Sequence, residues 1–165
     1  MITDIQSMVK MEAGAQQQFR VMRVKPSEKQ DEEAYRLIVD ELPSPNAKPQ
    51  KGIQLVMRYS LPLFVNVQNN TEPKLQWRAE KAANSKTVLV AENTGNAHAQ
   101  LSSITVQTTS AKDALTLASG LAGYVLPGHT WKRELEVSPA SLNPGRLNAT
   151  VNGMPIQTEV RFAAP

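Results

Sequence analysis

The chain has 165 residues, of which 41% are apolar, 18 are basic, 15 are acidic and none is cysteine. This composition is that of a folded protein with a core, and it excludes disulfides and thiolate zinc sites. The net charge of +3 is mild, and no run of five Lys or Arg is present, so nucleic acid is not expected as a partner. No apolar run approaches the roughly 20 residues that cross a bilayer.

Strand signals, in which apolar and polar residues alternate between turn-forming clusters, dominate the first half of the chain. Three strands are predicted there, over residues 16–24, 34–42 and 52–67. A loop with three prolines precedes the last of them. Polar residues follow it, and we place the domain boundary there: a first part over residues 1–68, a linker over 69–73 and a second domain over 74–165.

The second half contains more strand signals, at closer spacing. Seven strands are predicted, over residues 75–81, 87–92, 99–108, 123–126, 131–137, 147–151 and 156–162. In the clearest case, Trp131, Leu135 and Val137 share one face, and charged residues occupy the other. Asn152-Gly153 predicts a two-residue hairpin turn, because both positions of the favoured turn need a positive φ.

This inventory predicts an all-β fold with two immunoglobulin-like β-sandwich domains, of which the first is incomplete. About seven strands in roughly 90 residues are typical of such a sandwich. The first half, with three delimited strands and about four at most, has too few to close one. Trp77 and Trp131 are expected in the second core, and Tyr124 is expected to pack near a turn.

Catalytic signatures are missing from the sequence. His98 and His129 are the only histidines, and their spacing is not that of metal ligands. No phosphate-binding glycine loop, nucleophile elbow or zinc motif occurs. A carbohydrate-active sandwich would need a carboxylate pair in an aromatic cleft, yet only 5% of residues are aromatic. We therefore predict no catalytic residue, no metal and no cofactor.

Five segments together resemble the periplasmic pilus-assembly chaperones of the chaperone–usher type. They occur in the order and spacing of that family, over residues 13–21, 35–43, 58–65, 92–101 and 123–128. The Arg-Tyr-Ser-x-Pro-x-Phe-Val run in the third segment points to the archaic, spore-coat-protein-U-like branch.

The resemblance implies a non-enzymatic periplasmic chaperone. Such a protein binds a pilus or fimbrial subunit by lending it a long strand, and passes the subunit to an outer-membrane usher. In this sequence the strand falls within residues 52–67, with Ile53, Leu55 and Met57 on one face. The remaining candidate partner-binding residues are Gln54, Arg58 and Tyr59.

Two alternatives stay open at this point. The three apolar residues of this strand could instead face the chain's own core. The chain could also be a structural or adhesive module that forms a homodimer by strand exchange.

The sequence departs from the family in two respects. Family members begin with an export signal and further strands, so this chain is expected to be truncated at its amino end. The family anchors a subunit's terminal carboxylate with one Arg and one Lys; the Arg belongs to that missing region, and the nearest counterpart of the Lys is Gln54. Arg58 could replace the anchor or serve a structural role, and Arg20, Arg23 and Arg36 could line the same cleft or form a wet face.

Overall fold

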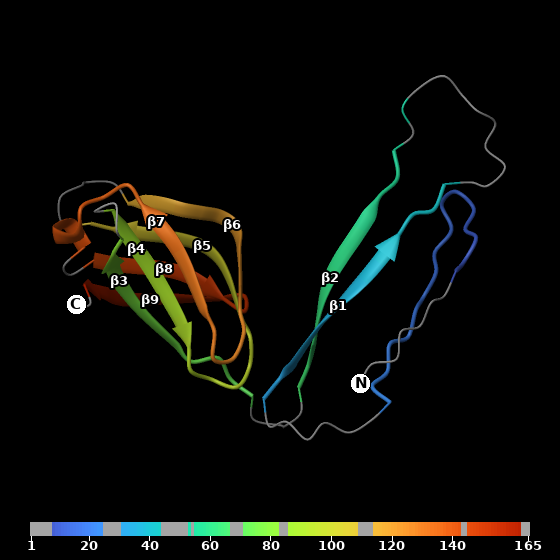
Figure 1. The fold of residues 1–165 in the computed structure, drawn as a ribbon, viewed down its shortest axis with the longest axis horizontal. Helices are drawn as coiled ribbons and strands as arrows, with labels where there is room; N and C mark the ends of the chain where they lie inside the picture. Colours follow the sequence, from blue (N-terminus) through green and yellow to red (C-terminus); the bar gives the residue numbers. More distant parts are fainter. Residues whose placement is uncertain are drawn as a thin grey trace.

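The computed structural model describes residues 8–24, 31–43, 53, 55–66, 71–82, 86–108, 114–142 and 145–162. Within these residues the chain is all-β apart from one short 3-10 turn, and the strands form two separate sheets (Figure 1). This confirms the predicted fold class.

The first sheet is an antiparallel hairpin of β1, Glu33–Asp40, and β2, Arg58–Val65. The second sheet has seven strands in the order β6-β5-β8-β9-β3-β4-β7. Their bounds are β3 Leu75–Lys81, β4 Thr87–Asn93, β5 Ala99–Gln107, β6 Leu115–Val125, β7 Thr130–Leu135, β8 Gly145–Val151 and β9 Met154–Phe162, with η1 at Pro139–Leu142.

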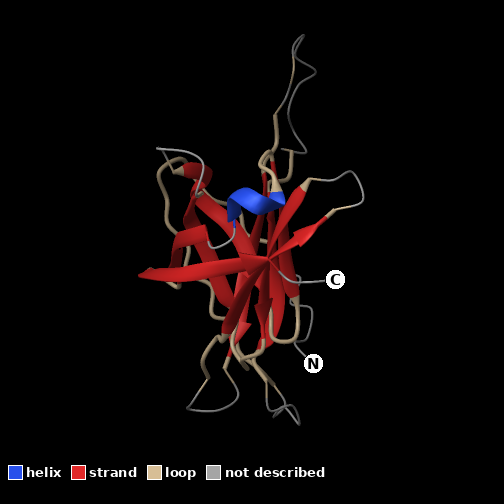
Figure 2. Ribbon diagram, turned by 90° about the vertical axis from the view of Figure 1, so that its left-hand side faces the viewer, coloured by secondary structure: helices blue, strands red, loops and turns tan. Residues whose placement is uncertain are grey.

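The seven strands fold around one apolar core. The fully buried side chains of this core include Leu89, Leu101, Ile104, Leu135, Leu147 and Val160. Trp77 and Trp131 pack against this cluster. Their two rings contact each other edge to face, with centroids 6.3 Å apart. All neighbouring strands are antiparallel except β3 and β9, which pair in parallel over a short stretch; Figure 2 shows the strands from the side. Both tryptophans, which were expected to fill this core, are half-buried and pack against it.

Local turn chemistry was predicted correctly at the β8–β9 hairpin. Asn152 and Gly153 have φ values of 49° and 81°, and Val151 pairs with Met154 across the two-residue loop. The extent of β6 was not predicted correctly, since only its last residues had been assigned to a strand. Its register against β5 shifts three times, and this irregularity blurs the alternation from which a strand is recognised.

Two strand predictions in the first half need correction. Residues 16–24 form no strand, because no other described segment pairs with them. The strand predicted over 52–67 is shorter, beginning at Arg58 and ending at Val65. Alternation specifies a face, but a strand also needs a neighbour with which to exchange hydrogen bonds. Of the predicted strand, residues 52, 54 and 67 lie outside the described residues.

The two sheets occupy different parts of the chain. The hairpin ends at Val65 and the seven-stranded sheet begins at Leu75, so the linker placed at 69–73 falls between them. Figure 1 shows the hairpin and the sandwich meeting at one end only. The domain boundaries themselves stay a prediction.

Candidate partner-binding strand

The β1–β2 hairpin has one apolar face. Cross-strand neighbours in an antiparallel pair share a face, and the register places Leu37 opposite Leu61 and Val39 opposite Tyr59. All four of these side chains are exposed. The complete apolar face consists of Tyr35, Leu37, Val39, Tyr59, Leu61 and Leu63.

The chain just ahead of β2 carries the most exposed apolar side chains of this region. Ile53 is 91% exposed, Leu55 84% and Met57 56%. The Tyr59 hydroxyl lies 3.3 Å from the Met57 sulfur, so these two side chains share a face. All three apolar candidates therefore point to solvent in the described chain, and Gln54 lies outside the described residues.

The side chain of Arg58 is paired with another residue of the hairpin. Its guanidinium donates two hydrogen bonds to the carboxylate of Asp40, the residue directly opposite, at 2.5 and 2.8 Å. These bonds hold the pKa of the Asp40 carboxyl below its usual value and raise the pKa of Arg58. This pairing matches the structural role that the sequence left open for Arg58.

The other arginines of the first half differ in their surroundings. Arg36 donates a 3.1 Å hydrogen bond to the Ser60 hydroxyl, and Arg23 lies 3.6 Å from the Glu33 carboxylate. That carboxylate also accepts a hydrogen bond from the Tyr35 hydroxyl, which raises the pKa of Tyr35. Arg20 is exposed. Of these, only Arg36 lines a cleft between the two sheets.

That cleft has a volume of about 420 Å³ and mixes apolar and polar walls. The hairpin supplies Arg36 and Phe64, and the sandwich supplies Tyr124 at the end of β6. The full lining is Ala34, Tyr35, Arg36, Pro62, Phe64, Tyr124 and Leu126. Its walls offer a guanidinium beside aromatic rings, which suits an anionic group attached to an apolar one.

A contact that sequence analysis missed fixes the hairpin to the sandwich. The Glu32 carboxylate accepts a hydrogen bond from the His98 backbone N–H at 2.6 Å and contacts the ring Nδ1 at 2.7 Å. Only 3% of the Glu32 side chain is exposed. The ring of Phe64, from β2, stacks on the His98 ring with centroids 3.6 Å apart, and Tyr124 lies beside both. No spacing in the sequence brings these residues together.

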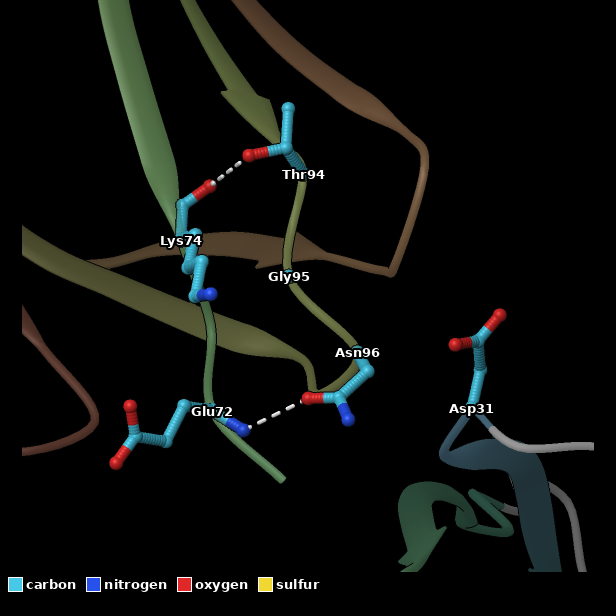
Figure 3. Close-up of a pocket in the computed structure, with 6 residues that line it drawn as sticks. All are labelled: Asp31, Glu72, Lys74, Thr94, Gly95 and Asn96. Atoms are coloured by element: carbon cyan, nitrogen blue, oxygen red, sulfur yellow. Dashed lines mark hydrogen bonds between the residues drawn. The ribbon is translucent and has the colours of Figure 1, made fainter. Parts of the chain in front are cut away.

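A second hollow, of about 450 Å³, lies where the linker passes the β4–β5 turn (Figure 3). Asn96 accepts a hydrogen bond from the Glu72 N–H at 2.9 Å, and the Thr94 hydroxyl donates to the Lys74 carbonyl at 3.3 Å. At Gly95 a Cβ would overlap the Glu72 carbonyl oxygen, so only glycine allows the linker to lie this close.

Two kinds of feature are absent from the described residues. They contain no group of three or more His, Asp or Glu side chains arranged to hold a metal ion. None of their helical segments is long and apolar enough to span a membrane.

The geometry thus defines an all-β protein in which an immunoglobulin-like sandwich carries a hairpin with an exposed apolar strand. Residues 2–69 match the family of pili and flagellar-assembly chaperones, in the N-terminal domain named after PapD. No curated protein matches the chain.

One solved structure is similar over most of the chain. It is the crystal structure of the CsuC–CsuE chaperone–tip adhesion subunit pre-assembly complex, from the archaic chaperone–usher Csu pili of Acinetobacter baumannii. The match has a TM-score of 0.54 and 26% identity, and it covers 87% of this chain and 66% of that chain. Together with the family match, it confirms the resemblance to pilus-assembly chaperones of the archaic chaperone–usher branch.

Proposed function

We propose that the chain is a periplasmic chaperone that stabilises pilus or fimbrial subunits by adding its own strand to their unfinished sheet. The observation that carries the proposal is the exposure of Ile53, Leu55 and Met57 ahead of β2. When a strand is added to a partner's sheet, main-chain hydrogen bonds provide affinity and alternate side chains fill pockets. An open apolar groove is the natural counterpart of such a strand.

The energetics favour this strand as the contact. Burying each of the three side chains contributes about 1.5 to 3 kcal/mol, from which the cost of ordering both partners is subtracted. Residues 55 and 56 belong to no ladder in the described chain, so a partner displaces no existing hydrogen bond there. The similar solved structure is a complex with a tip adhesion subunit, which supports a pilus subunit as the partner class.

A subunit's terminal carboxylate would bind more readily to Arg36 than to Arg58. Arg58 would first have to release Asp40, whereas Arg36 donates only to the Ser60 hydroxyl among the described residues. Arg36 also lines the cleft beside Phe64 and Tyr124. A planar guanidinium suits a carboxylate there, with the aromatic rings covering the attached apolar side chain.

The remaining steps follow from the class of chaperone. The periplasm is the proposed compartment, and an outer-membrane usher is the proposed acceptor of the bound subunit. The proposal requires no catalysis, cofactor or nucleic acid, since burial and strand pairing do the work.

Copurification tests the proposal. The tagged chain is co-expressed in the periplasm with a pilus subunit from the source organism, and the subunit recovered with it is quantified. Leu55→Asp should abolish recovery, because a buried unpaired carboxylate is costly. Leu121→Asp is the matched control: Leu121 is also an exposed leucine, but it lies on the sandwich strand β6. Equal recovery with both variants would count against donation by this strand.

The same variants distinguish the alternative function, self-association by strand exchange, from the chaperone function. Light scattering of the purified chain alone would then show a dimer that Leu55→Asp dissociates. A chain that stays monomeric and retains the subunit supports the chaperone.

A further inference from the structure

The hydrogen bonds of the hairpin decide which backbone groups of β2 are free. The Glu41 N–H donates to the carbonyl oxygen of Met57 at 2.8 Å, and the β1–β2 register, continued by one residue, places these two directly opposite. In an antiparallel pair, hydrogen-bonded and non-hydrogen-bonded positions alternate. The peptide groups that turn toward the outer edge of β2 therefore belong to the even-numbered residues, Arg58, Ser60, Pro62 and Phe64.

Pro62 agrees with this assignment and interrupts the outer edge. Proline has no N–H, and it is tolerated in a strand where the ladder needs none, as on the outward side of an edge strand. Arg36, opposite Pro62, therefore loses no hydrogen bond. A strand added along the outside of β2 would find donors at Arg58 and Ser60 but none at Pro62. The next donor is the N–H of Phe64, a residue whose side-chain ring stacks on the His98 ring.

We propose that a partner strand pairs with this chain only ahead of Pro62, using the N–H and C=O groups of Arg58 and Ser60, and that Pro62 ends the paired stretch. This rests on the proposed function, in which β2 is the strand offered to the partner. The partner segment is then extended and alternately apolar, and it ends or bends away at the height of Pro62.

The side chains support the same boundary. Exposure of the apolar residues is greatest ahead of β2, at Ile53 and Leu55, and falls toward Phe64 and Val65, which are half-buried. Apolar contact comes from odd-numbered residues and ladder hydrogen bonds come from even-numbered ones. The most exposed apolar side chains and the outward N–H groups of Arg58 and Ser60 therefore both lie ahead of Pro62.

Amide hydrogen exchange of the wild-type chain, free and with the pilus subunit bound, tests the boundary directly. The amides of Tyr59 and Leu61 should be protected in both states, because they bond to β1. Those of Arg58 and Ser60 should become protected only in the complex. New protection at Phe64, or on the outer edge of β1 at Ile38 in place of Ser60, would overturn the proposal.

A matched pair of prolines tests it by affinity. Ser60 and Ile38 are cross-strand partners with outward peptide groups on opposite edges of the same hairpin. Ser60→Pro should weaken subunit binding about tenfold, because one ladder donor is lost and a partner carbonyl is left unpaired. Ile38→Pro should leave binding unchanged. Ser60→Ala controls for the lost hydroxyl, which accepts from Arg36.

The outcomes separate this inference from the proposed function. If Leu55→Asp abolishes binding while Ser60→Pro and Ile38→Pro behave alike, the chaperone function stands and the edge assignment is wrong. If the wild-type chain binds no subunit, the proposed function itself fails. The exchange measurement needs no variant, so it decides the boundary even where a proline disturbs the hairpin.

Discussion

The strands of both sheets alternate apolar and polar residues, but the apolar side chains are buried in one sheet and exposed in the other. In the sandwich, Leu89, Leu101 and Leu147 are completely buried. In the hairpin, Leu37 and Leu61 lie on an equally apolar face and remain exposed. The difference is that strands of the seven-stranded sheet face one another across a core, whereas the hairpin has two strands. Alternation therefore defines an apolar face, and the rest of the fold decides what covers it.

The edges of the two sheets also differ in how well they are protected against strand addition. The outer edge of β6 receives side-chain donors from β7: Trp131 Nε1 donates to the Ala122 carbonyl at 3.2 Å, and Arg133 donates to the Leu117 carbonyl at 3.4 Å. Such donors blunt an edge against strand addition. On β2 the described chain offers no comparable cover ahead of Pro62. The hairpin is thus the part of the described structure best suited to pair with another chain.

The largest expected effect is in the sandwich core. Leu101→Ala should lower the free energy of unfolding by about 2 to 5 kcal/mol, because it leaves a cavity. Leu61→Ala, on the exposed hairpin face, should change it by less than about 1 kcal/mol. Both tryptophans, Trp77 and Trp131, lie in the sandwich, so urea titrations followed by their fluorescence report this comparison. Similar losses for the two variants would mean that the sheets share one core.

The linker provides the next test. Gly95→Ala should destabilise the protein by about 1 to 3 kcal/mol, since the added Cβ meets backbone atoms of Glu72 and Lys74 that cannot move without shifting the linker. Gly120→Ala is the control, because open space surrounds that position. The measurement is the thermal midpoint of both variants. Equal thermal midpoints would show that the close approach of the linker to the β4–β5 turn does not require glycine at position 95.

His98→Ala, at the contact between the hairpin and the sandwich, should lower the free energy of unfolding by about 1 to 3 kcal/mol. His98→Ala removes the ring that stacks on Phe64 and leaves the buried Glu32 carboxylate with one hydrogen bond fewer. Exchange of the β1 and β2 amides should then rise, while the core amides of β8 change little. A uniform rise in both regions would instead indicate that one cooperative unit unfolds.

The smallest expected effect concerns the far end of the hairpin. Because Arg58 lowers the pKa of Asp40, their pair contributes stability above the ordinary carboxyl pKa of about 4, and this contribution is lost as the pH falls through the lowered value. Arg58→Met should return the Asp40 pKa toward its ordinary value in a carboxyl NMR titration. An unchanged titration in that variant would show that the pair does not form in solution.

Much of the sandwich could be predicted from the sequence, because its signals are local. The alternation around Trp131 and the Asn152-Gly153 turn each depend on neighbouring residues, and both were confirmed. The partner-binding assignment of Ile53 and Leu55 came from the family resemblance; the structure adds their exposure, and the role stays a prediction.

The tertiary structure alone decided the rest. The contact of Glu32 with His98 joins residues 66 apart in the sequence, and the alternation of residues 16–24 could not show that no other described segment pairs with them. Sequence patterns record which side chains avoid water and where the chain turns, since both depend on a few consecutive residues. Burial, edge exposure and ion pairing depend on which distant segment arrives alongside, and only the folded chain determines that.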